Sequence, residues 1–144
     1  MKINKIYMTF TYDEIRDLAL QHETYQLMIH DSISFPFVID FNDKRLKLFM
    51  RQNTCQICGS EGVEFRLELK FTQTTFNLYA KNGAMLTFDH IVPKSLGGTN
   101  EESNGQCLCF SCNKKKGNLL NSTLREDLLF KEKQKAEAWI QQKN

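Results

Sequence analysis

Apolar and charged residues alternate most regularly in the middle of the chain. From Val63 to Phe71 every second residue is apolar and a charged residue stands between, which predicts a half-buried strand over 63–71. A partner strand is expected over 75–80. Asn82-Gly83 is typical of a two-residue hairpin turn, which would return the chain as a strand over 84–88. The pattern therefore predicts a small antiparallel meander that ends just before residue 89.

Helical spacing of apolar residues marks both ends of the chain. After a short strand over 2–10, the capping-box pattern Thr11-x-x-Glu14 predicts a helix over 12–30. We expect His22, on the apolar side of this helix, to be a packed or partly exposed residue rather than a ligand. A second pattern, Thr123-x-x-Glu126, predicts a last helix that packs back on the body. Its apolar stripe consists of Leu128, Leu129, Ala136, Trp139 and Ile140.

The segment between these regions adds one strand and one helix. Residues 34–41 are strand-like, and Pro36 favours an edge position or a strand start. A helix over 44–51 follows and turns Leu46, Phe49 and Met50 inward. At 144 residues the chain fits a single domain with a real core. We expect an accessory region over 1–45, a core over 46–122 and a C-terminal helix over 123–144.

Composition indicates where the protein is expected in the cell more than what it does. The chain has no apolar run of about 18 residues and no signal-peptide pattern, so we expect a cytoplasmic protein without membrane contact. A net charge of +2 does not by itself indicate a nucleic-acid binder. Three consecutive lysines at 114–116 nevertheless concentrate positive charge at one place.

Four of the five cysteines form two C-x-x-C pairs, a spacing typical of a zinc site. Cys55 and Cys58 form one pair, and Cys109 and Cys112 form the other. Four thiolates close the coordination shell of a zinc ion, so this zinc would be structural rather than catalytic. Cys107 is an alternative ligand to Cys109; since the two share a face on a strand, we treat Cys107 as a neighbouring core residue.

Residues 89–116 resemble the signature of HNH endonucleases of the ββα-metal fold. That signature is D-H-I-[IV]-P, then G-G, an Asn and L-C-x-x-C-[HN]-x-x-K. The matching positions are Asp89-His90-Ile91-Val92-Pro93, Gly97-Gly98, Asn104, Leu108-Cys109-x-x-Cys112-Asn113 and Lys116. The resemblance implies an α+β fold whose ββα-metal core has strands over 86–88 and 105–108 and a helix over about 111–120. The four-cysteine zinc knuckle, the meander and the two terminal helices would surround this core.

The resemblance also implies roles for individual residues. His90 would be the general base that deprotonates the attacking water, and Asp89 and Asn113 would hold one catalytic cation. Asn104 would tie down the loop and orient His90 through the backbone. Cleavage would leave 5′-phosphate and 3′-hydroxyl ends. Asn113 stands where the signature often has His, and an all-oxygen ligand pair favours Mg2+ or Mn2+ over Zn2+ or Ni2+.

Double-stranded DNA is the partner that this resemblance favours. Lysines near the motif are candidates for phosphate contacts, which give affinity without sequence preference. They are Lys94, Lys114, Lys115 and Lys116. Two alternatives remain: a non-catalytic zinc module that binds nucleic acid or protein, and a purely structural zinc-stapled domain. Neither needs Asp89, His90 and Asn113 together. The sequence does not distinguish a monomer from a homodimer.

Overall fold

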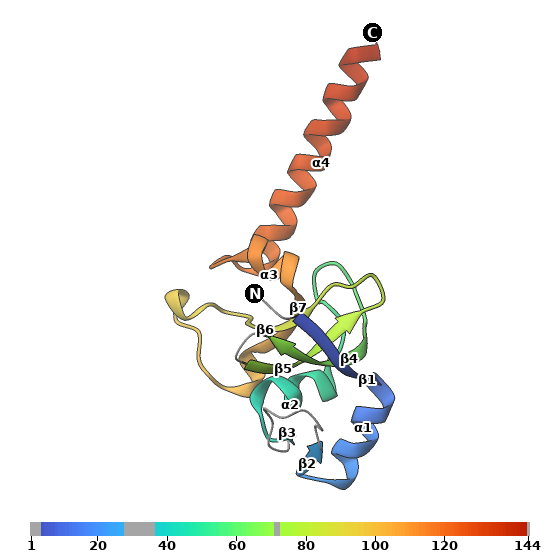
Figure 1. Ribbon diagram of the computed structural model, residues 1–144. Coiled ribbons are helices and arrows are strands. Elements are labelled where there is room, and N and C mark those ends of the chain that lie inside the picture. The colour runs from blue at the N-terminus through green and yellow to red at the C-terminus, as the bar shows by residue number, and fades with distance from the viewer. Residues whose placement is uncertain (1–3, 28–36, 71–72, 144) are drawn as a thin grey trace.

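The chain folds into a mixed α+β structure with three small antiparallel sheets and four α-helices in the described residues (Figure 1). The computed structural model describes residues 4–27, 37–70 and 73–143. In chain order the elements are β1 (Asn4–Thr11), α1 (Tyr12–Gln21), β2 (Thr24–Leu27), β3 (Phe37–Asp40), α2 (Lys44–Arg51), β4 (Gly62–Lys70), β5 (Gln73–Ala80), β6 (Leu86–His90), β7 (Gly105–Cys109), α3 (Phe110–Lys116) and α4 (Asn121–Lys143). The predicted α+β class is confirmed.

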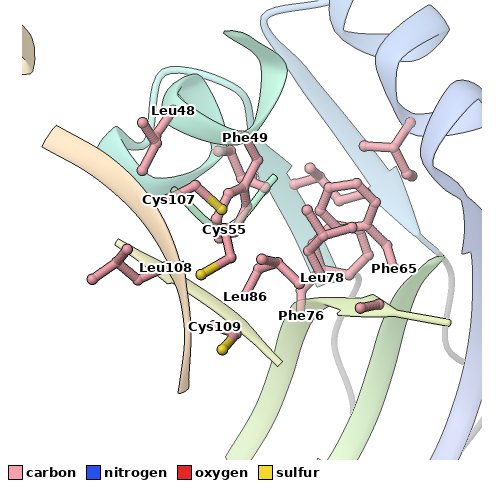
Figure 2. Packing of buried hydrophobic residues seen from close by; sticks show 14 of the residues in the cluster. Leu48, Phe49, Cys55, Phe65, Phe76, Leu78, Leu86, Cys107, Leu108 and Cys109 are labelled. Carbon is pink, nitrogen blue, oxygen red and sulfur yellow. The ribbon is translucent and has the colours of Figure 1, made fainter. Parts of the chain in front are cut away.

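The largest sheet has the order β1-β4-β5, and its inner face forms the core together with α1 and α2. Phe65 of β4 stacks on Phe76 of β5, with ring centroids 5.0 Å apart. Phe49 of α2 packs against the ring of Phe65. Figure 2 shows these side chains in one cluster that also contains Leu48 and Leu86. This continuous core fixes α2 and β6, the two elements that flank the functional residues.

The regular alternation predicted burial correctly in the middle of β4, whereas Val63 is exposed, Leu69 is partly buried and Phe71 lies outside the described residues. Phe65 and Leu67 are fully buried, whereas the charged residues between and beside them are only partly buried. The turn at Asn82-Gly83 is also present, with Gly83 at a φ of 86°, a left-handed conformation that favours glycine. The predicted partner strand extends further back than expected, to Gln73.

The strand that returns after the hairpin turn pairs with β5 only at its start, so the predicted meander is incomplete, whereas the pairing of strands over 86–88 and 105–108 that the resemblance implies is confirmed. After the turn, the returning chain makes only an isolated bridge between Tyr79 and Met85. It then becomes β6, which pairs with β7 in a separate two-stranded sheet. All five residues of β7 are buried, so the β6–β7 ladder joins the core.

The N-terminal helix is shorter than predicted. The capping box at Thr11 is formed, but α1 ends at Gln21, and residues 24–27 form β2 instead. Tyr25 pairs with Ile39 of β3, so pairing between strand-forming residues overrides the helical spacing. Residues 28–30 of the predicted helix and 34–36 of the predicted strand lie outside the described residues. His22 caps the end of α1, is exposed, and has its ring 5.5 Å from that of Tyr25.

The C-terminal helix does not pack back on the body as predicted. Helix α4 begins at Asn121, before Thr123, and projects away from the sheets (Figure 1). Only its first turns are docked, through the buried Leu124. Leu129 is 71% exposed, because it lies about 140° around the helix from the docked Leu124. No helix in the described ranges is long and apolar enough to cross a membrane.

Candidate active site and zinc knuckle

The two C-x-x-C pairs meet in space. Cys55 and Cys58 lie in the turn between α2 and β4, whereas Cys109 ends β7 and Cys112 lies in α3. Their four sulfur atoms all lie within 4.8 Å of one another, and the sulfurs of Cys58 and Cys109 are 3.7 Å apart. A zinc tetrahedron with Zn–S bonds of about 2.3 Å has sulfur–sulfur edges of about 3.8 Å. The four residues therefore fit a zinc-type ion.

Backbone amides near the knuckle point at its sulfurs. The amide of Cys58 donates to the sulfur of Cys55 at 3.5 Å, and the amide of Cys112 donates to that of Cys109 at 3.4 Å. Gly59 takes a φ of 80°, so the tight turn after the first pair requires a residue without a side chain. These donors favour thiolates over thiols and so favour metal binding.

Without a metal, the thiols of the knuckle differ in acidity. Burial would raise the pKa of Cys58, but hydrogen bonds, chiefly with Ser60, lower it to about 6. Burial raises the pKa of Cys109 and of Cys112, and for Cys112 the hydrogen bond with Cys109 adds to the increase. A metal must therefore displace protons from these two thiols, and its affinity falls as the pH falls.

Cys107 is a core residue, as predicted. It is fully buried and stands outside the four-sulfur cluster. Its side chain is drawn beside Leu48 and Phe49 in Figure 2. Burial raises its pKa to about 12, so it stays a neutral thiol at physiological pH.

Strands β6 and β7 and helix α3 form a compact ββα unit around Asp89, His90 and Asn113. In the β6–β7 ladder, Asp89 lies opposite Gln106 and His90 lies opposite Gly105. The amide nitrogen of Asn113 donates to the hydroxyl of Thr87 at 2.8 Å. Because Thr87 and Asp89 share one face of the strand, Asn113 lies on the face that carries Asp89.

His90 contacts a different set of partners at the end of the strand. Its ring lies edge-on to that of Phe88, with centroids 5.5 Å apart. Its Nε2 is 3.3 Å from Oδ1 of Asn100, a loop residue that sequence reasoning did not single out. Half-buried Asp89 and His90 thus leave β6 on opposite faces, and β6 ends at His90. A group that meets both side chains has to lie at this strand end.

Lys116 is not a surface lysine, contrary to our prediction of a phosphate contact. Its side chain is fully buried, and its ammonium lies 2.8 Å from Oδ2 of Asp89. It also donates to the backbone carbonyl of His90 at 3.0 Å. Lys116 follows Asn113 by three residues on α3, so both residues face β6. Its charge is used inside the protein, to neutralise the carboxylate of Asp89.

Two further polar residues at this site escaped the sequence analysis. Gln106 is 2% exposed and donates from Nε2 to Oδ2 of Asp89 at 3.1 Å. The side-chain amide of Asn121, the first residue of α4, pairs with that of Gln106 through two hydrogen bonds. The available signal was a glutamine inside an otherwise apolar stretch, Gly105–Cys109, where an uncompensated amide would be costly.

The loop between the two strands is tied together by Asn104. Its side chain accepts from the amide of Val92 at 2.9 Å and donates to the carbonyls of Val92 and Thr99. Gly98 packs so closely against this loop that a Cβ there would lie 1.7 Å from the carbonyl oxygen of Val92. Gly98 is therefore a steric requirement of the loop that holds Asn100, whereas Gly97 has a φ of 90°, a left-handed conformation that favours glycine.

Helix α2 braces the same loop with basic side chains. Lys44 donates to the carbonyl of Asn100, and Arg51 donates to that of Glu102 at 2.7 Å. Lys47 forms an ion pair with the carboxylate of Glu102 at 3.2 Å. The loop is thus held from both sides, by Asn104 within it and by α2 outside it.

Residues 55–119 match the family model described as HNH endonuclease. These residues are similar to an HNH endonuclease domain, and we call them the HNH domain. This domain contains both cysteine pairs and the complete ββα unit. No curated protein and no solved structure matches the chain. The family implies a nuclease-type function, a metal site and a nucleic-acid substrate.

Three of the lysines near the motif lie on the surface of the HNH domain. Lys94, Lys114 and Lys115 are exposed. Lys114 and Lys115 lie in the last turn of α3, next to the buried Lys116. The last turn of α3 therefore presents positive charge to solvent.

Proposed function

We propose that the HNH domain is a divalent-metal-dependent endonuclease that hydrolyses phosphodiester bonds of double-stranded DNA, with His90 as general base. The observation that carries this proposal is the ββα unit matched by the family model, in which Asp89 and His90 end β6 and Asn113 lies on the face of β6 that carries Asp89. The four cysteines would hold a structural zinc that stiffens this unit.

Asp89 and Asn113 are the proposed ligands of the catalytic cation. They offer a carboxylate and an amide carbonyl on one face of β6, an oxygen donor set that suits Mg2+ or Mn2+. When bound, such a cation stabilises the negative charge that develops on the phosphate. Lys116 already neutralises Oδ2 of Asp89, so a cation would use Oδ1.

His90 would take the proton of the attacking water. The water oxygen then forms a bond to phosphorus, the bond between phosphorus and the 3′ oxygen breaks, and that oxygen gains a proton from solvent. The products are a 5′-phosphate and a 3′-hydroxyl. Asn104 and Asn100 would support this role, because Asn104 holds the loop after His90 and Oδ1 of Asn100 lies 3.3 Å from Nε2 of the His90 ring.

The exposed lysines are the proposed phosphate contacts. We expect Lys114→Ala and Lys115→Ala each to weaken binding of any duplex sequence and to reduce the slope of log K against log salt by about 1. Lys116→Met should leave this slope unchanged, because its ammonium is buried. Fluorescence anisotropy with labelled duplexes at several salt concentrations measures the slope. A reduced slope for Lys116→Met would show that this lysine reaches DNA.

Nicking of supercoiled plasmid tests the proposal. The zinc-loaded protein should nick the plasmid faster with Mg2+ or Mn2+ than with Ni2+. His90→Ala should lower the nicking rate by about 100-fold or more. His22→Ala is the matched control, since His22 is an exposed histidine at the end of α1. Cleavage that survives His90→Ala would remove His90 as the base.

The ion pair between Asp89 and Lys116 favours one alternative, a non-catalytic zinc module that binds nucleic acid or protein. In such a module the ammonium would permanently replace a metal at the carboxylate. Duplex binding without cleavage of any DNA or RNA in Mg2+, Mn2+ or Ni2+ would support this alternative.

A further inference from the structure

Gln106 is buried in the HNH domain beside the proposed metal ligand Asp89. It lies directly opposite Asp89 in the β6–β7 ladder and is 2% exposed. Among the described residues, Gln106 and Lys116 are the buried polar side chains of the protein, and both contact the same carboxylate oxygen. A neutral amide held this deep is costly unless each of its polar atoms is used.

The amide of Gln106 is fully used, and its orientation is fixed. Its Nε2 donates one hydrogen to Oδ2 of Asp89 at 3.1 Å and the other to Oδ1 of Asn121 at 2.9 Å. Its Oε1 accepts from Nδ2 of Asn121 at 2.7 Å. A reversed amide would place Oε1 against the carboxylate and lose both bonds to Asn121. The acceptor-only carboxylate of Asp89 therefore determines which end of Gln106 faces it, and Asn121 holds the amide in that orientation through its two hydrogen bonds.

Asn121 is itself anchored from outside the active site. It is the first residue of α4, whose docked side carries the fully covered Leu124. In the same turn of the helix, Arg125 donates to the carbonyl of Gln56 in the zinc knuckle. The position of Asn121 is thus set by packing and knuckle contacts rather than by the active site.

We infer that Gln106, held by Asn121, is a positioning residue that occupies Oδ2 of Asp89 together with Lys116 and presents Oδ1 as the single oxygen for the catalytic cation. This inference rests on the proposed function, because it assigns an orientation to a metal ligand. In the described part of the chain, both donors to this carboxylate are on Oδ2. Residues that orient a ligand in this way change metal affinity by about 10- to 100-fold when they are lost.

Mn2+ binding tests the inference without relying on cleavage. The zinc-loaded protein is titrated with Mn2+, and free Mn2+ is measured by its electron paramagnetic resonance signal. Gln106→Leu should raise the Kd about tenfold, and Asn121→Ala should raise it at least threefold. Asp89→Asn should abolish binding and so identify the site. Gln141→Leu is the matched control, since Gln141 is an exposed glutamine near the far end of α4.

A double mutant separates positioning from general damage to the fold. If Asn121 acts only through Gln106, then Asn121→Ala should have no further effect on the Kd in the Gln106→Leu background. Excess Mn2+ should restore most of the nicking rate of Gln106→Leu, because the lost property is ligand orientation. If Gln106→Leu does not fold with its full zinc content, the Mn2+ Kd of Asn121→Ala tests the inference instead: a raised Kd supports it and an unchanged Kd overturns it.

The outcomes distinguish this inference from the proposed function. Suppose that the wild-type protein binds Mn2+ and nicks DNA, and that the folded variants bind Mn2+ with unchanged affinity. This result overturns the positioning role of Gln106 and leaves the proposed function intact. Wild-type protein that binds no Mn2+ overturns both. Additive effects of Gln106→Leu and Asn121→Ala would show that Asn121 does not act through Gln106.

Discussion

The buried ion pair between Lys116 and Asp89 gives the sharpest stability prediction. Lys116→Met keeps the length of the side chain and its helix propensity but removes the charge. Lys115→Met, one residue earlier in α3, is the matched control because Lys115 is exposed. The two variants have the same composition and differ only in whether the lost ammonium was buried.

The magnitude follows from what Asp89 retains. Removal of one partner of a buried ion pair costs about 3–5 kcal/mol, because the other charge stays buried without compensation. The Asp89 side chain is 11% exposed and keeps its hydrogen bond from Gln106, so we expect a loss near the lower end, about 3 kcal/mol. Lys115→Met should change the free energy of unfolding by less than about 0.5 kcal/mol.

Urea unfolding of the zinc-loaded variants measures this difference, first without added Mg2+ and then with it. Added Mg2+ should stabilise Lys116→Met more than the wild-type protein, because binding of a cation at Asp89 replaces the missing positive charge. A loss below about 1 kcal/mol for Lys116→Met would refute the reasoning. It would mean that the ammonium is solvated rather than paired, and the phosphate contact originally expected for Lys116 would then be restored.

Two other predictions concern the knuckle and the terminal helix. After chelation of the zinc, Cys58 should react fastest with iodoacetamide at pH 7, because its pKa is lowered to about 6. Cys107 should stay unmodified while the protein is folded, because burial raises its pKa to about 12. Mass spectrometry of peptides measures both modifications, and early modification of Cys107 would contradict its place in the core. Leu124→Ala should cost about 2–4 kcal/mol and Leu129→Ala less than about 0.5 kcal/mol, because Leu124 is 4% exposed and Leu129 is 71% exposed. Equal losses in urea unfolding would show that α4 packs on the protein beyond its first turns.

Local patterns with one dominant cause were predictable from the sequence. The period-two alternation of β4, the helix over 44–51 and the hairpin turn at Gly83 follow from burial of one face and from backbone preference. The C-x-x-C pairs predicted a four-sulfur cluster because two such pairs in one chain favour metal coordination over free or disulfide-bonded cysteines.

Features that depend on partners distant in the sequence were not predictable. Nothing local marks the end of α1 at Gln21, since β2 exists only because β3 pairs with it. Likewise, Lys116 looked like its two exposed neighbours, and only the register of α3 against β6 buries it. The division into an accessory region over 1–45, a core over 46–122 and a C-terminal helix over 123–144 stays a prediction.

A crystal structure of the zinc-loaded protein soaked with Mn2+ tests the central claim most directly. The account predicts an anomalous peak bound by Oδ1 of Asp89 and by the side-chain oxygen of Asn113, at about the 2.1 Å expected of such oxygen ligands, with Lys116 still paired to Oδ2. The imidazole of His90 should face the phosphate that a soaked duplex places on this cation. A cation held elsewhere, or His90 turned away from that phosphate, would contradict the account.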